Sequence, residues 1–172
     1  MIRATLICTL GLAAGMARDA LAQNQTLAPE NPKPRVEAAL SLSGMVGGKP
    51  IQVSGAGTCR HAADASIEGT SASLWTVEYR GSDEGTVKEL DLTLWRPKDG
   101  GADQLSFKLK GKSGDHRIET RPGGKPKGQG TVTILPSGPG GRLELSGEDS
   151  KGKPIQISID CPAFSAAGAG DS

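Results

Sequence analysis

Apolar and polar residues alternate through most of the chain after residue 36. A period of two is typical of β-strands that bury one face, whereas no stretch of this region shows convincing helical periodicity. The alternation predicts eight strands, around residues 36–42, 51–53, 75–79, 90–94, 105–109, 132–134, 143–145 and 155–159. The segments between them are rich in glycine or proline, as tight turns require. The pattern therefore predicts an all-β domain, an antiparallel β-sandwich or partly closed barrel of about eight to nine short strands.

Two of the predicted hairpins resemble each other. Residues 42–44 and 48–54 (LSG and GKPIQVS) are echoed by residues 145–147 and 152–158 (LSG and GKPIQIS). Each pair indicates strand, turn and strand, with proline at the start of the second strand, where a missing N–H costs little. We expect a structural repeat of two hairpins without catalytic meaning.

The ends of the chain differ from this β region. Residues 1–22 combine Arg3, an uncharged apolar run and the small residues Ala20 and Ala22, which is the pattern of a secretory signal cleaved after Ala22. The apolar run is shorter than the ~20 residues that a membrane-spanning helix needs, so no transmembrane segment is expected. The proline-rich residues 23–35 are predicted to be a disordered tether, residues 36–164 the single β domain and residues 165–172 a disordered tail. The protein is thus expected to be periplasmic or secreted.

Cysteine content supports export. Removal of residues 1–22 leaves Cys59 and Cys161, and in an oxidising compartment these most simply form one disulfide. Such a bond closes a loop of about 100 residues and contributes up to about 4.7 kcal/mol in the chain-entropy treatment.

Charge is balanced overall but segregated along the chain. The exported part carries 18 basic and 18 acidic residues, which gives no general reason to bind nucleic acid or an anionic membrane. Residues 64–91 are strongly acidic, and residues 108–127 are strongly basic. The basic members are predicted to share one exposed surface, here called the basic segment: Lys108, Lys110, Lys112, Arg117, Arg121, Lys125 and Lys127. This surface could bind an anionic envelope polymer or an acidic protein. The interpretation that the sequence favours is the alternative, a solvated outer face neutralised by neighbouring acidic strands.

Catalytic motifs are weak. Gly111-Lys112-Ser113 lacks the upstream glycine and the following helix of a phosphate-binding loop. His61 and His116 could join Asp64, Asp115 and a serine in a hydrolytic triad, or bind a metal, but their spacing matches no known ligand pattern. No catalytic residue, metal or cofactor is therefore predicted.

One family resemblance is visible at the level of layout. A signal, a tether and a small β domain whose second cysteine ends a terminal strand (here residues 155–161, IQISIDC) resemble the exported domain of the mycobacterial nineteen-kilodalton lipoprotein antigens. The lipidation motif of that family is missing, because Ile7 precedes Cys8 and the apolar run continues beyond it. The resemblance implies a fold and no enzymatic activity.

These features together predict an exported, non-catalytic binding or accessory domain of the bacterial cell envelope, whose ligand the sequence does not identify. The alternatives are a small secreted hydrolase and an inhibitor of an exogenous hydrolase.

Overall fold

The computed structural model describes residues 38–67, 69–120 and 125–167. Within these ranges the chain forms strands and no helix, so the predicted all-β class is confirmed. The strands are β1 (Ala38–Val46), β2 (Lys49–Ile67), β3 (Thr70–Arg80), β4 (Val87–Pro97), β5 (Gln104–Gly111), β6 (Gly114–Glu119), β7 (Gln129–Ser137), β8 (Gly140–Glu148), β9 (Pro154–Cys161) and β10 (Ser165–Ala166).

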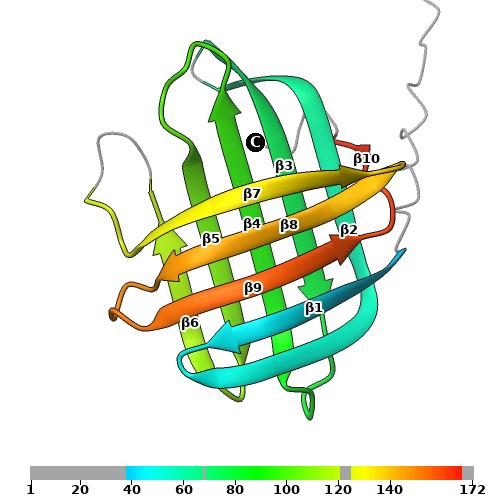
Figure 1. Cartoon of the computed structure of the whole chain (residues 1–172), viewed down its shortest axis with the longest axis vertical. Helices are drawn as coiled ribbons and strands as arrows, with labels where there is room; N and C mark the ends of the chain where they lie inside the picture. Colours follow the sequence, from blue (N-terminus) through cyan, green and yellow to red (C-terminus); the bar gives the residue numbers. More distant parts are fainter. Residues whose placement is uncertain (1–37, 68, 121–124, 168–172) are drawn as a thin grey trace, which may run out of the picture. The chain divides into compact units, whose positions relative to one another are not determined.

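One curled antiparallel sheet contains all the long strands, in the order β6-β5-β4-β3-β2-β1-β9-β8-β7. Figure 1 shows β1, β9, β8 and β7 crossing in front of β3, β4 and β5, so the sheet folds over itself as a half-barrel. Between the two edge strands, an isolated bridge pairs Glu119, the last residue of β6, with Lys127, which lies just before β7. The predicted partly closed barrel is therefore confirmed.

The long strand β2 carries the sheet from one layer to the other. Its first half pairs with β1 and its second half with β3, and Gly57 pairs with both strands. A Cβ atom at Gly57 would lie 2.3 Å from the Leu40 side chain and 2.6 Å from the backbone oxygen of Glu78. Glycine at this position therefore allows the two layers to approach closely where the strand bends.

The core lies between the two layers and is built from the inward half of each alternating strand. Leu105, Phe107 and Leu109 of β5 are at most 2% exposed, as are Leu90, Leu92 and Leu94 of β4. The period of two in the sequence thus corresponds directly to burial.

The two similar hairpins share one register. Leu42 pairs with Val53 and Gly44 with Ile51 in the first hairpin. In the second, Leu145 pairs with Ile157 and Gly147 with Ile155 at the equivalent positions. β1 also pairs with β9, so the two hairpins lie side by side in one layer.

The disulfide between Cys59 and Cys161 is present, with Cα atoms 6.0 Å apart and a separation of 102 positions in sequence. It links β2 to the last residue of β9, and both half-cystines are buried. This prediction is confirmed.

Some of the predictions concern residues outside the described ranges. These are the signal at 1–22, the tether at 23–35 and Arg121 of the basic segment. Ser165 and Ala166, at the start of the expected tail, form β10 and pair with β2. No helix in the described part of the chain is long and apolar enough to cross a membrane.

Candidate functional site

The half-barrel is hollowed near the disulfide. A cavity of about 490 Å³, here called the aromatic cup, is lined by His61, Trp75, Ile134, Pro136, Gly138, Pro139, Gly140, Phe164, Ser165 and Ala166. These residues come from β2, β3, β7, the turn between β7 and β8, and the segment that follows Cys161. The cup thus joins elements from both layers of the sheet.

Rings stack along one wall of the aromatic cup. His61 is paired with Trp75 across β2 and β3, and their ring centroids lie 4.6 Å apart with planes 13° from parallel. Phe164 meets the His61 ring edge-on, at 6.2 Å and 64°. The Arg96 guanidinium lies 5.6 Å from the centroid of Trp75. Stacked, edge-on and cation–π contacts of this kind hold aromatic side chains in fixed orientations.

The local sequence explains why these rings reach the cup. Trp75 shares the inward phase of β3 with Val77 and Tyr79, which are 1% and 6% exposed, whereas Trp75 itself is only half-buried and packs at the margin of the core. Phe164 is fixed by its backbone N–H, which donates to the Pro139 carbonyl at 2.9 Å. The hydroxyl of Ser165 donates to the Cys59 carbonyl at 3.2 Å. The segment after Cys161 is therefore hydrogen-bonded to the turn between β7 and β8, which forms the opposite rim of the aromatic cup.

The aromatic cup is electrically neutral. Arg96 is neutralised by Asp103, to which its Nη2 donates at 2.7 Å and its Nε at 3.1 Å, and Nη2 also donates to the Val132 carbonyl at 3.2 Å. Partial burial lowers the pKa of His61, which favours its uncharged form at neutral pH. Its Nε2 atom is buried and has no hydrogen-bond partner. Buried polar atoms without a partner are uncommon and point to strain or an absent partner.

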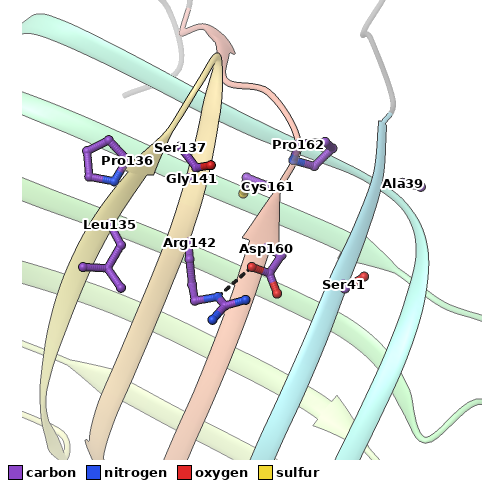
Figure 2. A pocket seen from close by; sticks show the side chains of 10 residues that line it. All are labelled: Ala39, Ser41, Leu135, Pro136, Ser137, Gly141, Arg142, Asp160, Cys161 and Pro162. Atoms are coloured by element: carbon purple, nitrogen blue, oxygen red, sulfur yellow. Dashed lines mark hydrogen bonds and ion pairs between the residues drawn. The ribbon is translucent and has the colours of Figure 1, made fainter.

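A second hollow, here called the outer groove, lies on the other side of the β7–β8 hairpin end (Figure 2). It has a volume of about 520 Å³ and shares Pro136 with the aromatic cup. Figure 2 shows Arg142 and Asp160 pointing toward each other in its middle, joined by a hydrogen bond of 2.7 Å. This contact raises the pKa of Arg142. Arg142 and Asp160 thus neutralise each other. The outer groove is a shallow polar surface with Leu135 exposed at its side.

A buried histidine–carboxylate pair lies at the end of β8 and β9 that is away from the disulfide. The Nδ1 atom of His116 in β6 lies 2.8 Å from Oδ2 of Asp149, in the turn between β8 and β9, and the side chains are 2% and 0% exposed. The His116 Nε2 atom lies 3.3 Å from the carbonyl oxygen of Ser113. The second carboxylate oxygen of Asp149 accepts hydrogen bonds from the backbone N–H groups of Lys151 and Lys153, at 2.8 and 2.9 Å. Here every polar atom of the pair has a partner.

The environment of Asp149 favours its ionised form. Burial acts to raise the pKa of the carboxyl, but the amides of Lys153 and Lys151 and the His116 ring outweigh it, and the pKa lies below its ordinary value. This pair therefore connects β6 to the β8–β9 turn by an internal hydrogen bond.

This arrangement places a serine, a histidine and an aspartate near one another, but a substrate has no access to them. The Ser113 hydroxyl is buried and makes no hydrogen bond, and the His116 nitrogen beside Ser113 faces the Ser113 carbonyl. A nucleophile needs a base within hydrogen-bond reach of its hydroxyl and an open approach for the substrate. The geometry is that of a structural contact.

The groups considered for a triad or a metal site are not brought together. Asp64 forms an ion pair with Lys98, His61 lines the aromatic cup and His116 bonds to Asp149. Asp115, next to His116 in sequence, has an exposed side chain. Across the described residues no three His, Cys, Asp or Glu side chains gather closely enough to hold a metal ion.

The basic segment is divided by the sheet. Strand β4 pairs with β5, which sets Asp91 opposite Lys108 and Glu89 opposite Lys110. The Nζ atoms of Lys108 and Lys110 lie 2.8 and 3.0 Å from the Glu89 carboxylate. These hydrogen bonds, that of Lys108 first, lower the pKa of Glu89 to about 2. Lys108 and Lys110 do point outward as predicted, but into a neutralised face.

The remaining cations of the basic segment are dispersed. Arg117 is paired with Glu119 at 2.9 Å. Lys112 is exposed before β6 and Lys127 is exposed after it, with Lys125 nearby. Six residues of strand separate these positions, a span of about 20 Å at ~3.3 Å per residue. The described members thus form no continuous cationic surface, and polyanion binding stays a prediction.

Several residues that make specific contacts in the structure were not identified from the sequence. The strand β6 was not expected, because its inward positions are His116 and Ile118, and one histidine breaks the apolar signal. Asp149 and Arg96 were not singled out by the sequence analysis. The only available signal for Asp149 was its place in a polar turn that follows a predicted strand, which is too common to be specific.

Comparison of the chain with protein-family models, with curated proteins and with solved structures gives no match. The resemblance to the mycobacterial lipoprotein antigens accordingly stays a prediction, and the function has to be argued from the geometry above.

Proposed function

We propose that this chain is an exported, non-catalytic binding domain of the bacterial cell envelope, and that it binds its ligand in the aromatic cup. One observation carries the proposal. The cup combines an open volume of about 490 Å³ with apolar and aromatic walls, to which the His61 ring and Ser165 add polar groups. Ligand sites are typically concave, largely apolar and supplied with a few polar groups that orient the ligand.

Export is supported by the pattern of residues 1–22 and by the Cys59–Cys161 disulfide. Disulfides of this kind persist in oxidising compartments. A periplasmic or secreted location is therefore part of the proposal.

Binding is favoured over catalysis by the difference between the two histidines. His61 is at an open site, but the one hydroxyl that lines the cup with it, that of Ser165, donates to the Cys59 carbonyl, and no acid lines the cup. His116 has an acid beside it but is closed to solvent. A hydrolase needs both properties at one place. The hydrolase and inhibitor alternatives have no comparable observation in their favour.

The test is a fragment titration of the exported, disulfide-bonded protein followed by ¹H–¹⁵N correlation spectra. Mixtures should include aromatic, aliphatic, cationic and anionic fragments. We expect saturable shifts of the amides around His61, Trp75, Ile134 and Phe164, with the amides around His116 and Asp149 unchanged as the internal control. Mixtures that leave the cup unshifted, or that shift the whole domain without saturation, would contradict the proposal.

A further inference from the structure

Strand β7 forms one edge of the sheet, and its second half is less covered than the opposite edge strand, β6. On β6, the Arg117 carbonyl accepts from the Ser150 N–H at 2.9 Å, and the last residue exchanges two backbone hydrogen bonds with Lys127. In the second half of β7, the described residues give the outward edge one hydrogen bond, from Arg96 Nη2 to the Val132 carbonyl. Unpaired backbone groups on a strand edge are a template for another strand.

The direction of the backbone groups along this edge follows from the Arg96 contact. Residues of an antiparallel ladder point their N–H and C=O groups alternately toward and away from the paired strand. Val132 points away from β8, because its carbonyl accepts from Arg96 of β4. Ile134 and Pro136 have the same phase, which is the one that tolerates a proline on an edge strand. Pro136 has no N–H, so in this half of β7 Ile134 is the residue whose N–H and C=O both lack a bond to any described residue.

The aromatic cup adjoins this part of the edge. Ile134 and Pro136 line it together with Trp75 of the other layer. Figure 1 shows β3 and β4 continuing past β7, which is the last strand of its layer. A strand added to β7 would lie about 4.8 Å from it. Because directly paired residues share one face of a sheet, the residue opposite Ile134 would direct its side chain to the face that lines the cup.

The lining favours an uncharged apolar side chain at that place. None of the residues that line the cup is Asp, Glu, Lys or Arg, and the nearby Arg96 is held by Asp103. A charged side chain would lose hydration there without gaining an ionic partner. The stacked rings of His61 and Trp75 and the edge-on ring of Phe164 offer contacts that a further ring gains beyond the area it buries. An aromatic or large aliphatic side chain therefore fits best.

A second copy of the chain fits this edge less well. If two β7 strands were paired, the inward side chains of each would still belong to that copy's own core, as Val132, which is 5% exposed, illustrates. Neither copy would then have a side chain available for the cup of the other. An extended segment that has no core of its own can both pair with the edge and fill the cup.

We propose that the edge of β7 binds an extended segment of a protein partner as an added antiparallel strand. One residue of this segment exchanges two backbone hydrogen bonds with Ile134 and places an aromatic or large aliphatic side chain in the aromatic cup. The inference rests on the proposed function and adds the chemical class of the ligand. In recognition of this kind, backbone hydrogen bonds give affinity and side-chain pockets give specificity.

Capped, uncharged pentapeptides test both parts of the proposal. The parent peptides carry phenylalanine, leucine or tryptophan between two threonines on each side, and the threonines favour an extended backbone. Replacing the central phenylalanine by alanine removes the side chain that enters the cup. N-methylation of the phenylalanine removes the donor to the Ile134 carbonyl. N-methylation of the threonine that follows it is the matched control, because in the proposed pairing that N–H points away from β7.

We expect the phenylalanine peptide to bind the exported protein saturably and to shift the amides around Ile134 and Trp75. The alanine peptide should bind about tenfold or more weakly, as loss of a buried ring implies. The peptide methylated at phenylalanine should bind about fivefold more weakly, as loss of one neutral hydrogen bond implies, and the control should bind like the parent. Hydrogen exchange of the Ile134 amide should slow on binding, while that of Thr133, which faces β8, should stay the same.

Failure of the ligand class and failure of the proposed function give different results. If small fragments saturate the cup but none of the three parent peptides binds, or if the two methylated peptides bind equally, edge pairing is overturned and the cup remains a binding site. If neither fragments nor peptides shift the cup, the proposed function is overturned as well. If the Ile134 amide becomes protected with rising protein concentration in the absence of peptide, a second copy replaces the partner segment.

Discussion

The two histidines of this domain lie near opposite ends of strands β8 and β9, and their surroundings differ. At the end where β8 runs into β9, His116 is 2% exposed and both ring nitrogens lie near oxygen acceptors. At the end where β9 reaches the disulfide, His61 lines an open cavity and its Nε2 has no partner. A buried polar pair with all its partners stabilises a fold, whereas a concave, largely apolar surface that stays open is the usual form of a ligand site.

The largest effect on stability should come from removing one partner of the buried His116–Asp149 pair. Asp149→Ala leaves His116 buried without its acceptor and removes the acceptor of two backbone amides. Loss of one partner of a buried pair typically costs about 3–5 kcal/mol. Urea unfolding should show a loss of this order, and Asp115→Ala, an exposed neighbour of the same histidine, should leave the midpoint nearly unchanged. Similar midpoints for the two variants would contradict the structural role given to Asp149.

The disulfide should have the next largest effect, because it supports the end that carries the cup. Replacing Cys59 and Cys161 together by alanine is expected to lower the free energy of unfolding by about 2–4 kcal/mol, and up to about 4.7 for a loop of this length. A reductant should bring the wild-type protein to the level of the double variant and leave the variant itself unaffected. A reductant effect on the variant would show that the stabilisation comes from elsewhere.

The pH dependence sharpens the account of Asp149. Its pKa in the folded state lies below its ordinary value, so its ionised form stabilises the fold fully above the unfolded value of about 4. That contribution disappears as the pH falls through the lower, folded-state value. Thermal unfolding measured between pH 7 and pH 2 should therefore show a smaller acid-induced loss for Asp149→Asn than for the wild type. Parallel curves would mean that protonation of the Asp149 carboxylate does not cause the acid-induced loss of stability.

Much of the fold could be predicted from the sequence, and the reason lies in the sheet. Leu105, Phe107 and Leu109 must face one way on a strand, so the core positions and the outward lysines follow from local pattern alone. The pairing of Cys59 with Cys161 followed from elimination. What could not be predicted depends on contacts between distant residues, such as His116 with Asp149 or Lys108 with Glu89, because these require the strand order and register.

The aromatic cup shows the same limit. Trp75 belongs to the strand predicted at 75–79, and it packs against the core in phase with Val77 and Tyr79. Nothing local shows that β3 extends beyond the closed part of the barrel at Trp75, or that Phe164 returns to meet His61. The site arises where the half-barrel opens, and that position is a property of the whole sheet.

The smallest expected effect concerns the basic segment. Lys108→Gln and Lys110→Gln remove ion pairs that are partly solvated, and each should change stability by less than about 1 kcal/mol. Retention of the double variant on a polyanion column at low salt should fall no further than that of Lys49→Gln with Lys153→Gln, two exposed lysines elsewhere. A clearly larger fall would establish the basic segment as a polyanion site, screened over about 10 Å at 0.1 M salt.

The central claim, that the open end binds a ligand in the aromatic cup, is tested most directly by two tryptophan variants of adjacent residues. Ile134 faces the cup, whereas Leu135, its neighbour on β7, faces the outer groove. With whichever fragment of the diverse mixtures saturates the cup, Leu135→Trp should titrate like the wild-type protein. Ile134→Trp, which fills the cavity, should weaken binding at least tenfold while retaining a cooperative unfolding transition. Equal binding by the two variants would contradict the account, because it would place the ligand outside the cup.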